Sequence, residues 1–198
     1  MKTSALGVLA TVSIYAIAGQ VAAQQQPSAP QNPGPAIAGV CVYHNERLLA
    51  QSAAGRALQQ GMERLANDVR TELQPYATNI QNEYQALQQG AQTIPQAELQ
   101  QRAQALQQRA QEAEQLEQTR EIELRYTLQM QRMAIAERVD PIIIQVYQER
   151  GCGILIDRES VYLMNPAMDI TDVVIQRLDQ QLPTLNFQRM TPPVQQQQ

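Results

Sequence analysis

Hydrophobic residues recur every three or four positions through the middle of this 198-residue chain. That spacing places them on one face of an α-helix, so it predicts one long helix from Glu46 to about Gln89 and a second that ends near Arg150. Pro75 and Pro141 lie inside the two patterns and predict a bend in each helix. The first stripe comprises Leu58, Met62, Leu65, Val69, Leu73, Tyr76, Ile80, Tyr84 and Leu87, and the second includes Leu99, Ala103, Leu106, Ala110, Ala113, Leu124, Ile135 and Val146.

The segment between the two helices has the residues of a helix end followed by a helix start. Gly90 ends the first stripe, and Thr93-Ile94-Pro95-Gln96 suits the first turn of the next helix. A short loop between two long helices predicts an antiparallel hairpin over residues 45–150, roughly 65–85 Å long. The stripes then form either a coiled-coil seam or a narrower seam that leaves apolar surface free for a partner.

Short apolar segments flank this hairpin arm. Ala36–Tyr43, Gly151–Asp157 and Val161–Met164 are predicted strands, and Asp169 is predicted to start a terminal helix. The first two strands adjoin the two ends of the hairpin, which predicts antiparallel neighbours. The fold class is therefore α+β, in which a small β base from residues 36–44 and 151–182 carries the arm. So small a sheet has open edges, which favours oligomerisation through the base.

The two ends of the chain have a different composition from the middle. Residues 1–23 have the pattern of an export signal, with Lys2, an uncharged apolar run, and a cleavage site after about Ala23. Residues 24–35 and 183–198 are rich in Pro and Gln and predict a flexible leader and a disordered tail. No later stretch has the length and hydrophobicity of a membrane span, so we expect an exported protein without stable membrane insertion.

The charge of the chain argues against one class of partner. Lys2 is the only lysine, and the chain beyond residue 23 carries 14 arginines against 19 acidic residues, a net charge of −5. Because an acidic protein does not attract phosphate backbones, nucleic acid is not an expected partner.

Side chains for catalysis or metal binding are scarce. His44 is the only histidine, and its candidate co-ligands Cys41, Glu46 and Asp157 have no recognised ligand spacing. Ser160 has no evident base. We therefore expect a structural role for His44, and no enzyme activity, metal or cofactor.

Cys41 and Cys152 lie on the two sides of the arm, each within a few residues of it. On neighbouring strands they form a candidate disulfide, which an oxidising compartment would permit. The alternative is a pair of buried thiols that pack as small hydrophobic side chains.

Two segments carry a resemblance to a known family. Ser52-Ala53-Ala54-Gly55-Arg56-Ala57 follows the first strand, and Asn165-Pro166-Ala167-Met168-Asp169-Ile170-Thr171-Asp172 precedes the last helix. With the hairpin between them, the chain from about Ala36 to Leu182 resembles the Skp/OmpH family of periplasmic chaperones. The resemblance implies a homotrimer whose β base carries three helical arms around a cavity. It also implies that the arms hold unfolded outer-membrane proteins in the periplasm without ATP. Known members are strongly basic, whereas this chain is acidic, so contact with lipopolysaccharide or anionic lipid is not carried over.

A holdase chaperone binds many sequences weakly, and scattered apolar side chains on a flexible arm suit that task. The alternatives are a structural coiled-coil spacer of the cell envelope, which predicts a regular and uninterrupted stripe, or an adaptor for one envelope partner. The expected client contacts are the stripe residues Met62, Leu65, Val69, Tyr76, Ile80, Tyr84 and Leu106.

Overall fold

The computed structural model describes residues 34–193. The expected signal peptide, all but the last two residues of the expected leader, and residues 194–198 lie outside the described residues. No helix in the described part of the chain is both long and apolar enough to cross a membrane.

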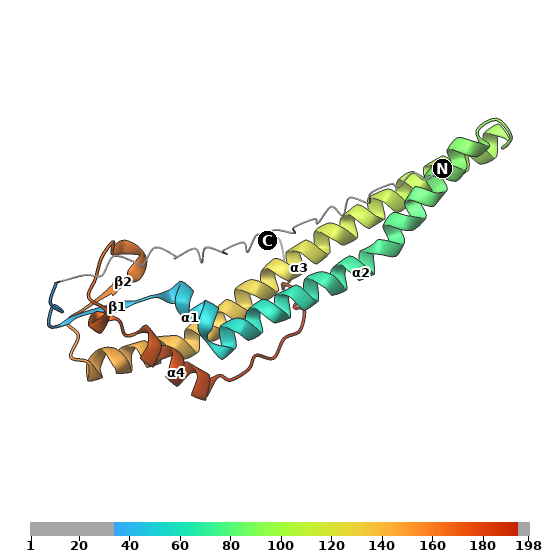
Figure 1. The fold of residues 1–198 in the computed structure, drawn as a ribbon. Coiled ribbons are helices and arrows are strands. Elements are labelled where there is room, and N and C mark those ends of the chain that lie inside the picture. Colours follow the sequence, from blue (N-terminus) through green and yellow to red (C-terminus); the bar gives the residue numbers. More distant parts are fainter. Residues whose placement is uncertain (1–33, 194–198) are drawn as a thin grey trace, which may run out of the picture. The chain divides into compact units, whose positions relative to one another are not determined.

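Two long antiparallel helices form the hairpin (Figure 1). α2 spans Ala53–Gly90 and α3 spans Gln96–Glu149, so the predicted arm is present and α2 ends at the expected glycine. Both helices continue through the positions where the sequence predicted a bend, Pro75 in α2 and Pro141 in α3.

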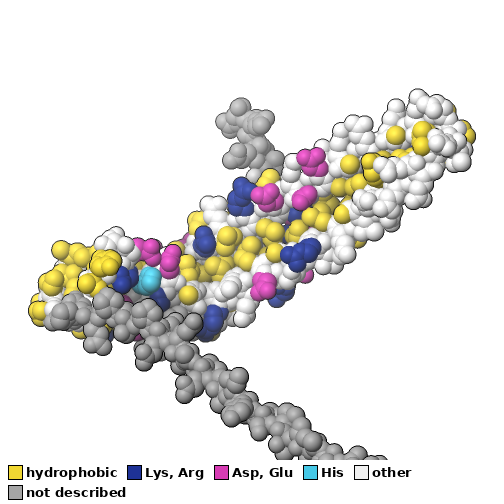
Figure 2. All heavy atoms as spheres, turned by 45° about the horizontal axis from the view of Figure 1, so that its top comes forward, with side chains coloured by type: hydrophobic (Ala, Val, Ile, Leu, Met, Phe, Trp, Pro, Cys, Tyr) yellow, Lys and Arg dark blue, Asp and Glu magenta, His cyan; other side chains and the backbone are white. Residues whose placement is uncertain are grey.

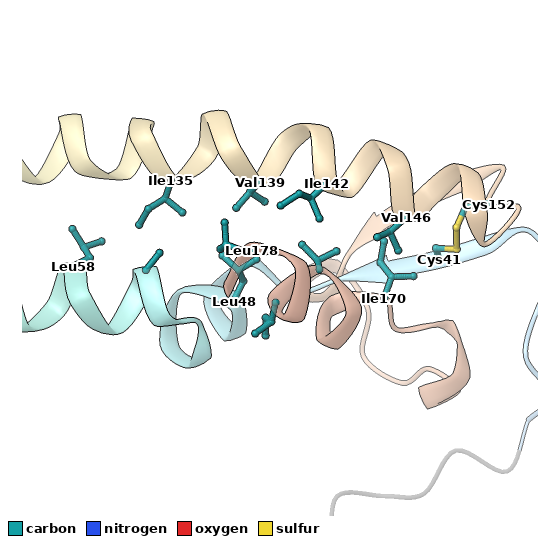
Figure 3. Packing of buried hydrophobic residues seen from close by; sticks show 13 residues of the cluster. Cys41, Leu48, Leu58, Ile135, Val139, Ile142, Val146, Cys152, Ile170 and Leu178 are labelled. Carbon is teal, nitrogen blue, oxygen red and sulfur yellow. A yellow bond between two sulfur atoms is a disulfide. The ribbon is translucent and has the colours of Figure 1, made fainter. Parts of the chain in front are cut away.

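The base combines short elements from both ends of the chain with the last turns of α3. One hydrophobic cluster joins them (Figure 3), and Leu48, Val146 and Leu178 from three different helices are almost completely buried in it. The first helix after the strand therefore belongs to the base, whereas the sequence placed the start of the arm at residue 45. The base elements are β1 (Val40–Tyr43), α1 (Asn45–Gln51), β2 (Ile154–Asp157) and α4 (Thr171–Gln181).

α1 and α2 are separate helices because the chain turns at Ser52. The Ser52 hydroxyl accepts a hydrogen bond from the Gly55 N–H (3.0 Å) and caps α2. The Asp179 carboxylate of α4 accepts from the Ala53 N–H (2.6 Å), which fixes the start of the arm on the base. A side chain at Gly55 would collide with the carbonyl group of Leu49, so this turn requires glycine there.

β1 and β2 pair in parallel, with Val40 opposite Ile154 and Tyr43 opposite Asp157, so the predicted antiparallel pairing is wrong. The reason lies in the helix lengths. α3 has 54 residues against 38 in α2, and it runs past the start of α2 to the far end of the base (Figure 1). The chain then reverses at Gly151, in the left-handed region (φ 65°), and β2 runs beside β1 in the same direction.

The segment Val161–Met164 does not form the predicted third strand, and among the described residues the sheet has two strands. A single parallel bridge between Val42 and Asp169 takes that place, where the Ile170 N–H donates to the Val42 carbonyl oxygen (2.9 Å). The segment instead exposes Tyr162 and Leu163, the tyrosine to 91%. Two 3₁₀ helices flank it, η1 (Arg158–Ser160) and η2 (Pro166–Met168).

Cys41 in β1 and Cys152 just before β2 form a disulfide, with their Cα atoms 5.7 Å apart (Figure 3). The disulfide links β1 to the short segment that joins the end of α3 to β2. Of the two arrangements that the sequence left open, the structure contains the bridged one.

Residues 183–193 differ from the disordered tail that the sequence predicted for 183–198. They form no helix or strand, but Leu185 and Phe187 pack against the hydrophobic cluster of the base. Arg189 forms ion pairs with Glu72 of α2 and Glu123 of α3. This part of the prediction is wrong because composition indicates only whether a segment can fold by itself. Here the hairpin supplies the surface against which the segment packs.

Candidate functional site

Two open, mainly apolar grooves lie between α2 and α3 in the outer part of the hairpin, and a more polar hollow lies beside them. The proximal groove has a volume of about 650 Å³, and the distal groove, nearer the loop, about 620 Å³. Apolar side chains from both helices dominate each of them. The proximal groove is lined by Arg70, Leu73, Gln74, Tyr76, Ala77, Ile80, Ala110, Ala113, Glu114 and Glu117. The distal groove is lined by Ile80, Gln81, Tyr84, Leu87, Gln88, Ala91, Leu99, Ala103, Leu106, Gln107 and Ala110.

Alanine on α3 explains why these grooves are open. Ala113 lines the proximal groove, Ala103 the distal one, and Ala110 both. A methyl group reaches too short a distance from its helix to fill the space beside the larger side chains of α2. Near the base, α3 presents larger side chains such as Ile135 and Ile142, and the interior is closed.

The structure brings together four of the seven side chains that the sequence selected as client contacts. Tyr76 and Ile80 line the proximal groove, and Ile80, Tyr84 and Leu106 line the distal groove. Tyr76 is 46% exposed and Tyr84 is 51% exposed, although both are large and largely apolar. The outer hairpin therefore presents apolar surface that residues 34–193 leave exposed.

The other three selected side chains lie elsewhere. Leu65 and Val69 are each only 8% exposed, and Met62 packs against the cluster of the base. They belong to the interior of the inner hairpin, so the structure does not include them in either groove. The grooves add Leu73, Leu87 and Leu99, which the same hydrophobic stripes contain.

Charged side chains border the apolar surface without filling it. Figure 2 shows hydrophobic side chains in a continuous band along the hairpin, with charged groups at its edges. Arg102 of α3 donates to Glu83 of α2 (2.9 Å) and lowers the pKa of that carboxyl. Closer to the base, Arg120 donates to Glu72 (2.6 Å). These cross-helix pairs hold the two helices together on either side of the proximal groove.

His44 lies at the junction of β1 and α1. Its backbone N–H donates to the Thr171 hydroxyl (2.9 Å), which ties the end of β1 to α4. Its Nε2 atom lies 3.6 Å from a Glu159 carboxylate oxygen, and Glu46 completes a group of three potential metal ligands within 4.8 Å of one another. Of the three co-ligands that the sequence considered, Glu46 belongs to this group and Cys41 and Asp157 do not, and Glu159 takes part in their place.

A small disulfide-linked α+β base that carries a long helical hairpin with apolar grooves defines the structural class of this protein. The chain matches the family of outer membrane proteins described as OmpH-like over residues 39–178, and it belongs to that family. The matched region covers β1, the hairpin, β2 and most of α4, and it ends before residues 183–193 begin.

One solved structure is similar over nearly its full length. It is a proposed outer membrane chaperone (OmpH-like) from Caulobacter crescentus, 37% identical in sequence, with a TM-score of 0.75. The match covers 82% of this chain and 96% of that one. None of the curated proteins compared with the chain matches it.

Proposed function

We propose that this protein is an ATP-independent holdase chaperone of the periplasm that binds unfolded outer-membrane proteins along the proximal and distal grooves. The observation that carries the proposal is the apolar surface exposed on the outer hairpin, around Tyr76, Ile80 and Tyr84. A folded chain gains nothing by leaving such surface in water, so its exposure is a mark of a binding surface. Family membership and the Caulobacter crescentus relative support the same reading.

The grooves suit clients of many sequences. Apolar contact has no preferred direction, and each large side chain that a client covers contributes about 1.5–3 kcal/mol. Several such contacts give useful affinity, yet each is weak enough for a client to leave stepwise during folding. No step needs nucleotide.

We infer that three copies assemble through the base. Ile37, Ile154 and Leu163 are exposed apolar side chains in or beside the base, and a two-stranded sheet offers an open edge to a neighbouring copy. Three arms on one base would surround a client on several sides. Export through residues 1–23, with cleavage after about Ala23, completes the proposal by delivering the protein to the periplasm.

To test this, an outer-membrane β-barrel protein is unfolded in urea and diluted into buffer without nucleotide, and its aggregation is measured with and without the chaperone. The wild-type protein should keep the barrel protein soluble. Replacing Tyr76, Ile80, Tyr84 and Leu106 with Gln should abolish most of this activity. The matched control replaces Ile122 and Ile144, which are exposed on α3 outside both grooves, and should leave the activity intact.

A structural spacer or a single-partner adaptor is the competing function. Full activity of the groove variant, or no activity of the wild-type protein, would favour one of these. A spacer needs a seam that its own side chains fill, and the two grooves are the observation that disfavours it.

A further inference from the structure

Three buried polar side chains lie on one face of α3 beneath residues 183–193. Glu123, Thr127 and Gln131 are spaced four residues apart, so they follow one line along the helix. Gln131 donates to the Asn186 carbonyl oxygen (3.0 Å), and the Thr127 hydroxyl accepts from the Met190 N–H (2.8 Å). Buried polar groups need such partners, so this line of side chains matches the backbone of an extended segment.

A glycine on α2 makes room for the aromatic side chain of the segment. Gly61 lies inside α2, past its first two turns, where glycine costs about 1 kcal/mol relative to alanine. A methyl group there would overlap the ring of Phe187, the only phenylalanine of the chain. The glycine lowers the stability of the helix, and in exchange it leaves space in which the Phe187 ring packs.

An ion-pair network closes the far end of this surface. Arg189 lies 2.9 Å from Glu72 and 3.2 Å from Glu123, and Arg120 contacts the same two carboxylates. Hydrogen bonds from Arg120 and Arg189 lower the pKa of Glu72 to about 2. Two arginines and two glutamates thus join α2, α3 and the segment with no net charge left over.

The segment binds in an extended form in which partly buried and exposed side chains alternate. Leu185, Phe187 and Arg189 are partly buried, whereas Asn186 and Gln188 between them are exposed. Such period-two alternation is the signature of an extended segment with one face covered. The family match over residues 39–178 ends before this segment begins.

We propose that Gly61, Glu72, Glu123, Thr127 and Gln131 form a binding site for an extended peptide segment, and that residues 183–193 occupy it as an internal ligand. An alternating segment of an unfolded client, such as a strand of a membrane barrel, displaces them; this last step rests on the proposed function. The site differs from the proximal and distal grooves because it binds backbone groups and one positive charge as well as apolar side chains.

The occupied state is suited to exchange. Its three hydrogen bonds through backbone atoms and its partly exposed ion pairs each contribute modestly, so the segment opens more easily than the cluster of the base. Attachment to α4 keeps its effective concentration high, so it rebinds as soon as a client leaves. The internal ligand therefore acts as a built-in competitor that limits client binding to sequences able to replace it.

The first test is cleavage by trypsin after Arg189 in the full-length chain, followed by mass spectrometry of the released C-terminal peptide. The bond to Met190 is the one whose N–H donates to Thr127, so docking protects it. Gly61→Ala removes the space for the ring while it favours the helix, and it should speed release at least tenfold. Gln60→Ala, at the neighbouring exposed position, is the matched control. Equal rates in wild-type and Gly61→Ala protein would overturn the proposal.

The second test uses a labelled synthetic peptide with the sequence of residues 183–193. Full-length protein with Phe187→Ser and Arg189→Gln has a vacant site and should bind the peptide at least tenfold more tightly than the wild-type chain. Adding Gly61→Ala should abolish that binding. Equal affinity for all three proteins would contradict a built site.

An unfolded barrel protein should then displace the peptide from the vacant-site variant. Failure to displace it, with aggregation suppression intact, would refute the competitor role and leave the proposed function standing. Loss of both would refute the function, while the trypsin and peptide results would still report on the site.

Discussion

Removing the Cys41–Cys152 disulfide should lower the free energy of unfolding by up to about 5 kcal/mol. The bridge joins residues separated by 111 positions, so the closed loop contains α1 and the whole hairpin. In the chain-entropy model, a loop of that size restricts the unfolded chain by about 16 cal/mol/K, or about 4.8 kcal/mol at room temperature. Both cysteines are buried in the hydrophobic cluster, so alanines or free thiols there leave no unpaired charge.

The measured loss should lie below that figure if the unfolded hairpin keeps some helix, because residual structure already restricts the chain. The assay is urea unfolding of wild-type protein and of the Cys41→Ala/Cys152→Ala variant at one protomer concentration, since assembly also contributes to stability. The grooves lie far along the hairpin, so folded variant protein should keep its holdase activity. Two reactive thiols in denatured, unreduced wild-type protein would show that the disulfide is absent. Unchanged stability of the variant would show that the disulfide does not stabilise the fold.

Further predictions concern the core, the tail contact and the assembly. Ile142→Ala should cost about 2–5 kcal/mol in urea unfolding because Ile142 is 1% exposed in the cluster, whereas Ile144→Ala, at a 57% exposed side chain, should cost far less; equal costs would contradict the packing. Hydrogen bonds from Arg120 first and Arg189 second lower the pKa of the Glu72 carboxyl to about 2 from an ordinary 4.5, so the stability that this ion-pair network gives the folded chain is complete above about pH 4.5 and is lost as the pH falls toward 2. Hydrogen exchange at the Met190 amide should speed up as that stability is lost, and Glu72→Gln should reduce the pH dependence. Sedimentation of the chain from residue 24 should give a trimer, which deletion of residues 80–104 preserves and truncation at 150 abolishes; a wild-type monomer would exclude assembly through the base.

The parts of the fold that depend on local pattern could be predicted from the sequence. The hydrophobic stripes of α2 and α3 and the Gly90–Gln96 turn predict the hairpin, because each of these signals lies within a short stretch of sequence. The direction of β2 could not be predicted in this way. It depends on how far α3 extends beyond α2 and on the reversal at Gly151, which together decide at which end of the base the second strand begins.

For a related reason, the candidate site could be predicted only in part from the sequence. Val69 and Ile80 occupy equivalent positions in the stripe of α2, so periodicity alone cannot distinguish a buried residue from a groove residue. The difference comes from the opposite helix, where Ala110 leaves space beside Ile80. Docking of residues 183–193 was also hidden, because Phe187 and Gly61 lie 126 positions apart and neither indicates the other.

Site-specific photo-crosslinking shows whether an unfolded client lies in the grooves of the outer hairpin. A photoreactive phenylalanine analogue is placed at Tyr84 in the distal groove or, as the control, at Glu121, which is exposed on α3 and lines neither groove. We expect strong crosslinks from position 84 to an unfolded barrel protein and few from position 121, with no nucleotide present. Equal crosslinking from both positions, or none from position 84 while the client stays soluble, would contradict binding in the grooves.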